Sequence, residues 1–437
     1  MKEPVSEKPT DAAKQLPEPQ PIAANPLVAY VLLWFPLASE TFIFREIEQL
    51  EKEGMRLEVC TLYGKSLKGC SEAMKNYAGS VWRMGLKSAP AICRAFLRSL
   101  WKDPAKVISL AKRGLFRRMR NLEALAENIC CFFAGFALAE KCLADQVSLI
   151  HAAWANGPAT AAWVASRISG IPFAFTGRAG DIYPQDGILA EKARDALFIR
   201  TNNAANVAWL QSFCPESQKD KVKLIYNSVS FPRLDSGVRK IPQKPYKILA
   251  VGRFVRTKGF PYLLSAMARL LRENFPVQLS LIGDGAWRPR LEKMVKRLGL
   301  NQAVKMPGFL PNDEMPRLMA EHDVLVMPSV VHSNGDRDGI PNVIMEALSC
   351  GLPVVAADVC GISEIIQNGK SGFLVPQRNA KALAAAIRAC LEDWPTAQTL
   401  TAKGHELVLE MFDPKRNTLA LKELYLNSLE SGAHEQA

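Results

Sequence analysis

The stretch that decides the fold lies near the C-terminal end and reads Gly335-Asp336-Arg337-Asp338-Gly339-Ile340-Pro341-Asn342-Val343-Ile344-Met345-Glu346-Ala347-Leu348. A polar, glycine-bearing loop runs into Pro341, and a run able to form a helix follows. Proline is favoured at the first helical position, because the N–H that it lacks would have no partner there. We therefore expect Pro341 to begin a helix, whose free N–H groups and positive dipole end would attract an anion.

Two acids flank this helix start. Asp338 lies just before the helix and Glu346 lies inside it, eight positions on. The helical part of that gap spans about 7–8 Å at roughly 1.5 Å per residue, about the length of a diphosphate. One ligand could therefore place phosphates on the helix start and a hydroxyl-bearing group near each acid. A nucleotide-sugar, with ribose at one end and sugar at the other, fits that description.

Composition favours two soluble domains and an anionic partner. The chain has 437 residues, of which 48% are hydrophobic and 22% charged, so two domains with separate cores are expected. Ten cysteines in no paired spacing predict free thiols, and five scattered histidines give no metal-binding pattern. We expect no bound metal and no cofactor. The net charge of +12 favours a phosphate ligand, a membrane surface or nucleic acid.

Positive charge is concentrated between Arg83 and Arg120. This stretch holds eleven Lys or Arg residues against one acid, Asp103, with apolar residues between them. The pattern is typical of basic amphipathic helices that bind an anionic membrane surface. The alternative is a solvated helical face packed on its own domain. Nucleic acid is disfavoured, because the basic residues lack aromatic stacking motifs.

The N-terminal segment and the longest apolar run indicate where in the cell the protein is expected. Residues 1–26 are rich in Pro, Glu and Lys without an apolar core, which indicates a disordered tail and no signal peptide. The run Ile129 to Ala139 is shorter than the about 20 residues that span a bilayer, so we expect a buried helix. These features favour a cytoplasmic protein, peripheral at the inner face of the plasma membrane.

Strand-like and helix-like segments alternate in both halves of the chain. A buried strand at 27–33 precedes a helix that opens at Ser39-Glu40-Thr41 and ends near Gly54, and a second strand follows at 56–62. This order predicts a parallel sheet with ligand loops at the carboxyl ends of its strands. Further strands are predicted at 147–152, 172–176, 197–201, 222–226, 246–252, 278–282, 303–306, 324–327, 353–356 and 372–375.

The alternation is interrupted at residues 231–245, which hold three prolines and little periodicity. We expect an interdomain linker there. The predicted fold class is α/β, with two doubly wound Rossmann-like domains facing across a cleft. Their expected ranges are 27–230, with a basic helical insertion at 83–140, and 246–412, followed by a C-terminal helix at 413–437 that crosses back to the first domain.

Two motifs in the second half carry candidate ligand-binding groups. In Gly252-Arg253-Phe254-Val255-Arg256-Thr257-Lys258-Gly259, a strand ends at a glycine and two cations flank a tight loop. Arginine offers a fork for phosphate oxygens and lysine a point charge; the alternative is two solvated cations. Gly283-Asp284-Gly285 also follows a strand, although it does not complete a dinucleotide fingerprint.

The ordered set of motifs resembles the nucleotide-binding domain of retaining GT-B glycosyltransferases, glycosyltransferase family four. Further matches are Gly308-Phe309-Leu310, Pro328-Ser329, Gly339–Ala347, Cys350–Ala356 and Gly361-Ile362-Ser363-Glu364-Ile365-Ile366. The resemblance implies that Arg253 and Lys258 bind the donor diphosphate. It also implies that the first of two paired acids contacts the transferred sugar and the second the ribose. Here the first acid is Asp338, one methylene shorter than the family's glutamate, and the second is Glu346.

The remaining donor residues follow from the same motifs: Gly252, Gly283, Gly339, Ile340, Pro341, Asn342 and Val343. The N-terminal half is similar to bacterial exopolysaccharide members of the family, through Phe35-Pro36, Ser39–Ile43, His151-Ala152 and Ala155–Thr160. Those members often carry His-x-His-Asp where this chain has Arg178-Ala179-Gly180-Asp181. The resemblance implies an acceptor side formed by Ser39, Glu40, Thr41, Arg178 and Asp181, and a local ion pair is the alternative role of the last two.

The expected reaction moves a sugar from a nucleoside-diphosphate sugar to a saccharide or lipid-linked saccharide. Charge developing on the departing diphosphate would be stabilised by Arg253, Lys258 and the N–H groups near Asn342. The resemblance implies retention at the anomeric carbon, and no residue is a candidate covalent nucleophile. Two alternatives stay open at this point: a nucleotide-sugar epimerase of GT-B fold and a non-catalytic nucleotide-sugar-binding assembly protein.

Overall fold

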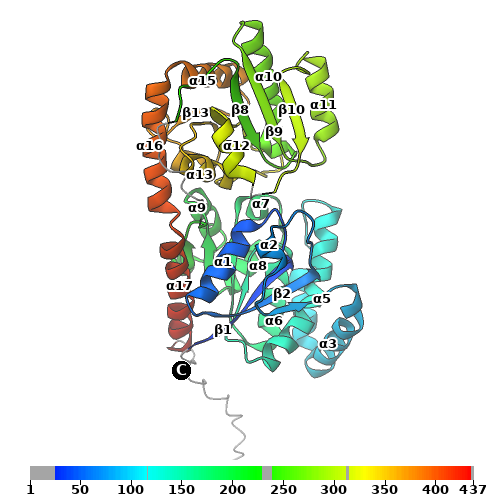
Figure 1. Cartoon of the computed structure of the whole chain (residues 1–437). Helices are drawn as coiled ribbons and strands as arrows, with labels where there is room; N and C mark the ends of the chain where they lie inside the picture. Colours follow the sequence, from blue (N-terminus) through cyan, green and yellow to red (C-terminus); the bar gives the residue numbers. More distant parts are fainter. Residues whose placement is uncertain (1–24, 116, 229–238, 312–313, 435–437) are drawn as a thin grey trace, which may run out of the picture.

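The computed structural model describes residues 25–115, 117–228, 239–311 and 314–434, and its chain forms two α/β units (Figure 1). The N-terminal unit is built on a seven-stranded sheet in the order β3-β2-β1-β4-β5-β6-β7, whose printed pairings are all parallel. The strands are β1 (Leu27–Trp34), β2 (Arg56–Gly64), β3 (Val81–Arg83), β4 (Leu149–Ala152), β5 (Phe173–Gly177), β6 (Ile199–Thr201) and β7 (Val222–Leu224).

Helices cover both faces of this sheet, as the continuous apolar strands require. They are α1 (Thr41–Lys52), α2 (Glu72–Lys75), α3 (Ala89–Lys102), α4 (Pro104–Gly114), α5 (Leu122–Ala144), α6 (Gly157–Ser169), α7 (Ala179–Ile182), α8 (Leu189–Asp195) and α9 (Ala205–Gln211), with 3₁₀ turns at Leu86–Ser88 and Glu216–Lys221.

The C-terminal unit repeats the plan with six parallel strands in the order β10-β9-β8-β11-β12-β13. These are β8 (Tyr246–Val251), β9 (Val277–Ile282), β10 (Val304–Gly308), β11 (Val324–Met327), β12 (Val354–Asp358) and β13 (Phe373–Pro376). Its helices are a 3₁₀ turn at Arg256–Lys258, α10 (Phe260–Arg272), α11 (Arg288–Arg297), α12 (Met315–Glu321), α13 (Asn342–Ser349), α14 (Ile362–Ile365) and α15 (Ala380–Glu392). The predicted fold class, two doubly wound α/β domains, is confirmed.

Two local predictions were wrong. The basic stretch does not begin as a helix, because Arg83 ends the short edge strand β3, and α3 starts only at Ala89. Pro341 is not the first helical residue: α13 begins at Asn342, and Pro341 precedes it in an extended conformation with ψ 127°. The other predicted strands were placed within about two residues, which is the usual spread of element boundaries.

Helix α5 contains the long apolar run and packs inside the N-terminal unit. Of the described helices, it alone has the length and composition to cross a membrane, and half of its most apolar window is buried. Gly135 brings it close to α6, because a Cβ there would lie 2.6 Å from Val164 Cβ. Phe132 and Phe136 of α5 belong to the hydrophobic core beneath the sheet. The predicted buried helix is therefore observed, and it is longer than the apolar run.

The last two helices connect the units. Helix α16 (Trp394–Met411) lies on the C-terminal unit, and α17 (Pro414–His434) continues along the N-terminal unit beside α1 (Figure 1). Leu421, Tyr425 and Leu429 of α17 share a hydrophobic core with β1. The predicted tail at 1–26 lies outside the described residues except for its last two positions. The linker predicted at 231–245 lies between β7 and β8, and its residues 231–238 are also outside the description, as are residues 435–437.

Candidate active site

The loop after β8 directs a lysine back over the end of its strand. The chain leaves β8 at Gly252, turns through Arg256–Lys258 and enters α10 after Gly259, which has φ +63°. Gly252 leaves room for the returning side chain, because a Cβ there would lie 3.1 Å from Lys258 Cε. Gly283, at the end of β9, packs directly on the Gly252 carbonyl. At both positions the absence of a Cβ lets a neighbouring group approach the backbone closely.

Lys258 meets the first acid of the paired set. Its Nζ lies 3.0 Å from Asp338 Oδ1, and the two side chains are only 13% and 15% exposed. Ser329, after β11, donates its hydroxyl hydrogen to Asp338 Oδ2 at 2.5 Å. The loops that follow β8 and β11 thus meet at this carboxylate, because Ser329 and Asp338 both belong to the loop after β11. The ammonium is held beside the loop that leads into α13.

Arg253 provides a second cation in this region. It is exposed and makes no ion pair with any residue that the structure describes. Its charge lowers the pKa of Asp336, although burial and the neighbouring Asp338 outweigh it and raise that pKa overall; Arg120 of the N-terminal unit acts with Arg253. An unpaired guanidinium beside a lysine and the free N–H groups of a helix start could bind an anion.

The residues at the start of α13 form the boundary between the two units. Ile340, Pro341 and Val343 are buried, and Asn342 is partly exposed at the first helical position. Gly339 lies against the N-terminal unit, because a Cβ there would lie 2.9 Å from Asn203 Nδ2. A ligand at the helix start would therefore be close to both units.

Glu346 lies on the buried face of α13. Its side chain is 6% exposed, and burial raises its pKa to about 7, with only the charge of Arg45 opposing that shift. Arg45 belongs to α1, in the other unit. The Glu346 carboxyl has no hydrogen bond or ion pair within the described residues. A buried carboxyl of this kind is suited to accept hydrogen bonds from a ligand that enters from outside.

The start of α1 presents a carboxyl between arginines of both units. Glu40 is the residue before the helix, with the exposed Ser39 on one side and Thr41, the first helical residue, on the other. Burial raises the pKa of Glu40 to about 7, and Arg178 and Arg253 partly oppose that shift. Glu40 therefore lies where the N-terminal unit approaches the loop after β8, which carries Arg253.

Arg178 is buried with part of its guanidinium unpaired. Its Nη1 donates to the Ala153 carbonyl, and the group lies 5.0 Å from the ring centre of Phe42 and 4.8 Å from that of Trp154. Its Nε and Nη2 have no hydrogen-bond partner among the described residues. These donors are closed off from solvent by the packed rings.

Asp181 does not form an ion pair with the Arg178 side chain, so the alternative of a local pair is wrong. Its carboxylate accepts hydrogen bonds from the backbone N–H groups of Arg178 at 2.6 Å and Ala155 at 2.5 Å. Burial raises its pKa to about 7. Gly180 beside it is exposed, and a Cβ there would have no atom within 4 Å. His151 is a core residue of β4, and burial lowers its pKa to about 3.

A small hollow of about 30 Å³ opens in the N-terminal unit next to these residues. Its wall includes Asp181, the Asn156-Gly157 start of α6, and Arg120 and Glu127 from the segment around the start of α5. Charged groups of both signs and an amide line it, so it could accept a single hydroxyl group of a ligand.

The family model described as "Glycosyl transferases group 1" matches residues 233–407. The putative colanic acid biosynthesis glycosyltransferase WcaL of Escherichia coli K12 is 27% identical over 375 residues, which are 83% of this chain and 90% of that protein. The amylovoran biosynthesis glycosyltransferase AmsK of Erwinia amylovora is 32% identical over 174 residues, 40% of this chain and 42% of its own. The chain is a glycosyltransferase of the GT-B fold.

Solved structures share this architecture at low sequence identity. Anabaena Alr3699/HepE in complex with UDP and glucose superposes with a TM-score of 0.66 at 19% identity, over 92% of this glycosyltransferase and 100% of that chain. Sucrose-phosphate synthase of Thermosynechococcus elongatus gives 0.70 at 19% identity, over 93% and 100%. These likenesses show the shared fold alone. Within the described residues of this glycosyltransferase, no group of three or more His, Cys, Asp or Glu side chains could hold a metal ion.

The sequence did not reveal the residues that join the two domains of the glycosyltransferase. Glu364 of α14 accepts hydrogen bonds from Ala204 N and Ala205 N, at the start of α9, and from the Tyr226 hydroxyl at 2.9 Å. Arg337 lies 3.9 Å from the ring centre of Tyr183. Glu364 was part of a matching motif, but its partners lie more than a hundred residues away, so only the folded chain could identify them.

Proposed function

We propose that this glycosyltransferase moves a hexosyl group from a nucleoside-diphosphate sugar to a saccharide or lipid-linked saccharide, with retention at the anomeric carbon. The observation that carries the proposal is the Lys258–Asp338 pair beside the unpaired Arg253 and the start of α13. The donor diphosphate would lie on Arg253, Lys258 and the N–H groups of Asn342 and Val343. No metal is needed in this scheme, because the cations and the helix start supply the positive charge.

The two acids contact the two remaining parts of the donor, the transferred sugar and the ribose. Asp338, fixed by Ser329 and Lys258, orients hydroxyls of the transferred sugar. Glu346, buried and without a partner among the described residues, accepts hydrogen bonds from the ribose. Lys258 lies between the acid and the expected phosphate, so it links sugar orientation to leaving-group stabilisation. Gly252, Gly283, Gly339, Ile340 and Pro341 shape the backbone of this site.

The reaction breaks the bond between the anomeric carbon and the diphosphate oxygen and forms a bond from that carbon to the acceptor oxygen. The acceptor hydroxyl proton passes to the departing diphosphate on the same face of the sugar, which preserves the anomeric configuration. The acceptor lies against the N-terminal domain near Ser39, Glu40 and Thr41, with one hydroxyl group at the small polar hollow beside Asp181. Arg178 supports this side by holding Phe42 and Trp154.

The cellular role follows from the relatives. WcaL and AmsK are described as colanic acid and amylovoran biosynthesis glycosyltransferases, and this supports a role in exopolysaccharide or cell-surface polysaccharide assembly. The enzyme would work in the cytoplasm, peripheral at the inner membrane face, where lipid-linked acceptors are found. The comparisons favour transfer over the epimerase and the non-catalytic alternatives.

Two measurements test the proposal. A thermal-shift panel of nucleoside-diphosphate sugars identifies the donor, because a bound ligand raises the unfolding temperature by mass action. NMR of the product formed from that donor and a saccharide acceptor gives the anomeric configuration. An inverted product would refute retention, and epimerisation of the donor without acceptor would refute transfer. Ligand binding without transfer or hydrolysis would restore the non-catalytic alternative.

A further inference from the structure

One face of α3 carries apolar and basic side chains that are largely exposed. The opposite face packs on α5, where the Phe96 ring centre lies 5.1 Å from that of Phe133. Arg94, Leu97, Arg98 and Trp101 follow the spacing i, i+3, i+4 and i+7, so they share the outer face. Leu97 is 59% exposed and Trp101 is 90% exposed. A tryptophan that exposed indicates a partner.

The segments on either side of α3 extend this surface. Leu86, in the turn before the helix, is 97% exposed, and Ile108 of α4 is 50% exposed. Val107 and Leu110 of α4 are buried in the core, so α4 too has an inner and an outer side. We call the outer surface formed by Leu86, Leu97, Trp101 and Ile108, with the basic residues between them, the α3–α4 face.

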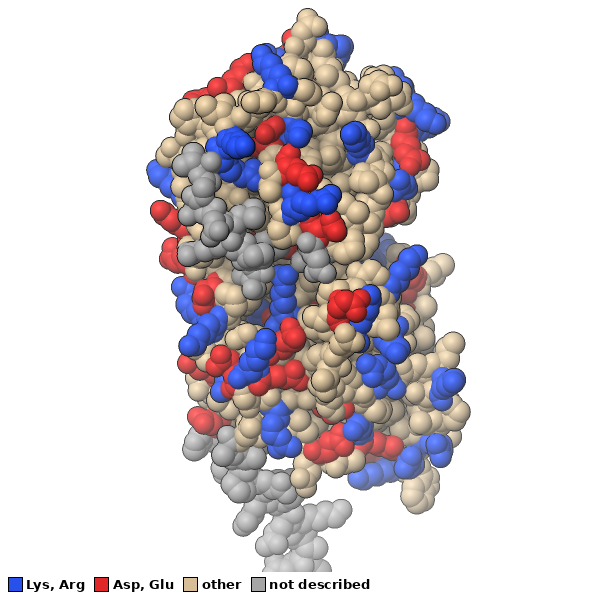
Figure 2. Space-filling view, viewed as in Figure 1, with Lys and Arg blue, Asp and Glu red and all other residues tan. Residues whose placement is uncertain are grey.

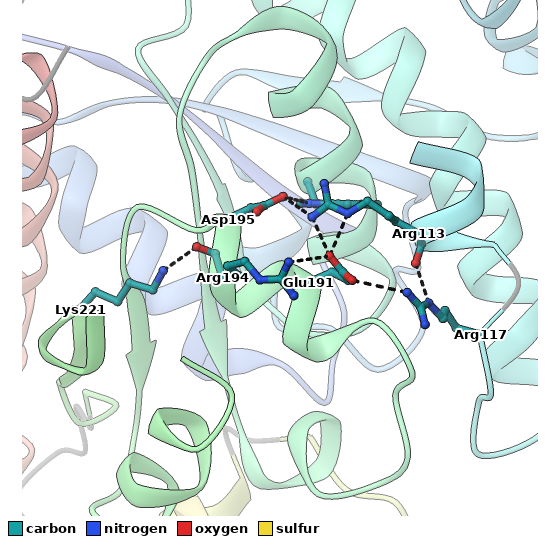
Figure 3. Close-up of polar contacts among 7 residues, drawn as sticks. Arg113, Arg117, Glu191, Arg194, Asp195 and Lys221 are labelled. Atoms are coloured by element: carbon teal, nitrogen blue, oxygen red, sulfur yellow. Dashed lines mark hydrogen bonds and ion pairs between the residues drawn. The ribbon is translucent and has the colours of Figure 1, made fainter. Parts of the chain in front are cut away.

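Three of the eleven cations between Arg83 and Arg120 are engaged within the domain. Arg98 pairs with Glu140 at the surface, at 3.2 Å. Arg113 lies 2.6 Å from Glu191 and 2.9 Å from Asp195, and Arg117 also approaches Glu191 (Figure 3). The half-buried Arg113 cluster ties the end of α4 to α8 and thereby fixes the α3–α4 face on the domain.

The other eight cations form no ion pair within the described residues. The single acid of the stretch, Asp103, is engaged, because its side chain accepts the Lys106 N–H at the start of α4. Lys and Arg side chains accordingly gather at the lower right edge of the molecule, over the region of α3 (Figure 2). The unpaired cations are Arg83, Lys87, Arg94, Lys102, Lys106, Lys112, Arg118 and Arg120.

We propose that the α3–α4 face binds an anionic lipid bilayer, with Leu97 and Trp101 entering the headgroup region and the unpaired cations meeting anionic headgroups. Exposed tryptophan and leucine between basic residues match the chemistry of a bilayer interface. The stretch then runs from α4 to Arg120, which lines the polar hollow on the acceptor side. The inference deepens the peripheral location given under the proposed function, but it does not depend on the transfer chemistry.

The test is co-sedimentation of the full-length protein with vesicles of phosphatidylcholine, with and without phosphatidylglycerol. We expect binding to the anionic vesicles that weakens as salt screens the charges. Leu97→Ser with Trp101→Ser should lower the vesicle partition coefficient about tenfold or more. Lys102→Glu with Lys106→Glu should abolish the preference for anionic lipid.

Matched controls change the same chemistry elsewhere. Ile241→Ser alters an apolar residue that is 75% exposed outside the α3–α4 face, and Lys293→Glu with Lys296→Glu reverses two exposed charges on α11. These variants should bind vesicles like the wild type. Equal loss in the controls, or no loss in the Leu97/Trp101 variant, would overturn the proposal, as would wild-type binding to an acidic protein or nucleic acid but not to vesicles.

Donor-induced thermal shift and transfer to a soluble acceptor without vesicles should be unchanged in all the variants. Those readouts separate a wrong docking face from a wrong catalytic proposal. A variant that loses vesicle binding but keeps both readouts supports the α3–α4 face. A variant that loses the donor-induced shift as well would contradict it, because the face would then act on the fold or on the site.

Discussion

Both oxygens of the Glu364 carboxylate lie 3.0 Å from the backbone nitrogen of Ala204, although the two residues belong to different domains. Helix α9 starts at Ala205 and has no side-chain cap of its own. Glu364 therefore caps a helix of the opposite domain, where a carboxylate is favoured by the helix dipole. Domain closure and local helix stability are thus coupled at one side chain.

Glu364→Ala should weaken the contact between the domains. Loss of the cap and of the bond to Tyr226 removes about 1–2 kcal/mol. Small-angle scattering of the ligand-free protein should then give a larger radius of gyration. Tyr226→Phe is the matched control, since it removes only the hydroxyl bond and should have the smaller effect. An unchanged radius in Glu364→Ala would show that other contacts hold the domains.

Lys258→Ala should reduce kcat/KM for transfer on the order of 10²-fold or more, because it removes a charge that stabilises the departing diphosphate. It also leaves the Asp338 carboxylate without its ion-pair partner. Steady-state kinetics with the identified donor measure the effect, and Lys296→Ala, an exposed lysine on α11, is the control. Turnover near the wild-type value would rule out the assigned role.

Donor affinity should depend on the ionisation of Glu346. Burial raises the pKa of this carboxyl to about 7, so it holds its proton below that pH and accepts ribose hydrogen bonds best above it. Calorimetry should therefore show donor binding about tenfold tighter at pH 8 than at pH 6. Glu346→Gln should bind more weakly at pH 8 and lose this dependence. A variant with the wild-type pH profile would place the titrating group elsewhere.

Glu40→Gln should slow transfer to the acceptor without changing donor affinity. The Glu40 carboxyl, whose pKa burial raises to about 7, lies at the domain boundary between Arg178 and Arg253. We expect transfer to fall about tenfold or more through lost positioning of the acceptor, with donor affinity unchanged. Glu48→Gln, on the helix α1 that Glu40 precedes, is the control. A parallel loss of donor binding would assign Glu40 to the donor instead.

Gly259 and Gly299 offer a matched pair of backbone tests. Their φ angles are +63° and +69°, but a Cβ on Gly299 meets nothing within 4 Å, whereas one on Gly259 would overlap the Pro328 carbonyl oxygen. Gly299→Ala should cost about 1 kcal/mol of unfolding free energy. Gly259→Ala should cost more and also weaken donor binding, because it displaces the Lys258 loop. Equal costs, measured by denaturant unfolding, would contradict the packing explanation.

Local patterns were sufficient to predict the architecture. Continuous apolar runs such as the one in β1, separated by helix signals, indicated two parallel sheets, because strands covered on both faces need apolar residues throughout. The strand β3 was missed, since two half-buried residues and one exposed residue carry no such pattern. Pro341 was placed one residue too far inside its helix, because sequence signals locate helix ends only approximately.

The site was predictable as a set of residues and not as a set of contacts. The order of motifs predicted that Lys258 and Asp338 serve one ligand, but their 3.0 Å pair depends on how the ends of β8 and β11 lie in the fold. The raised pKa of Glu346 comes from the burial of its carboxyl in the folded chain, and no local sequence pattern indicates that burial. Glu364 was overlooked as a capping residue because its partners lie in the other domain.

The path of α17 determines whether the chain can be cut into two complete domains. Leu421, Tyr425 and Leu429 complete a core that belongs to the first domain, and Lys422 donates to the Glu53 carbonyl at 2.6 Å. A single cut between β7 and β8 therefore separates no complete unit: the N-terminal fragment lacks an apolar wall, and the C-terminal fragment carries an exposed helix. The first domain is a discontinuous folding unit, and its last helix is synthesised only after the whole of the second domain.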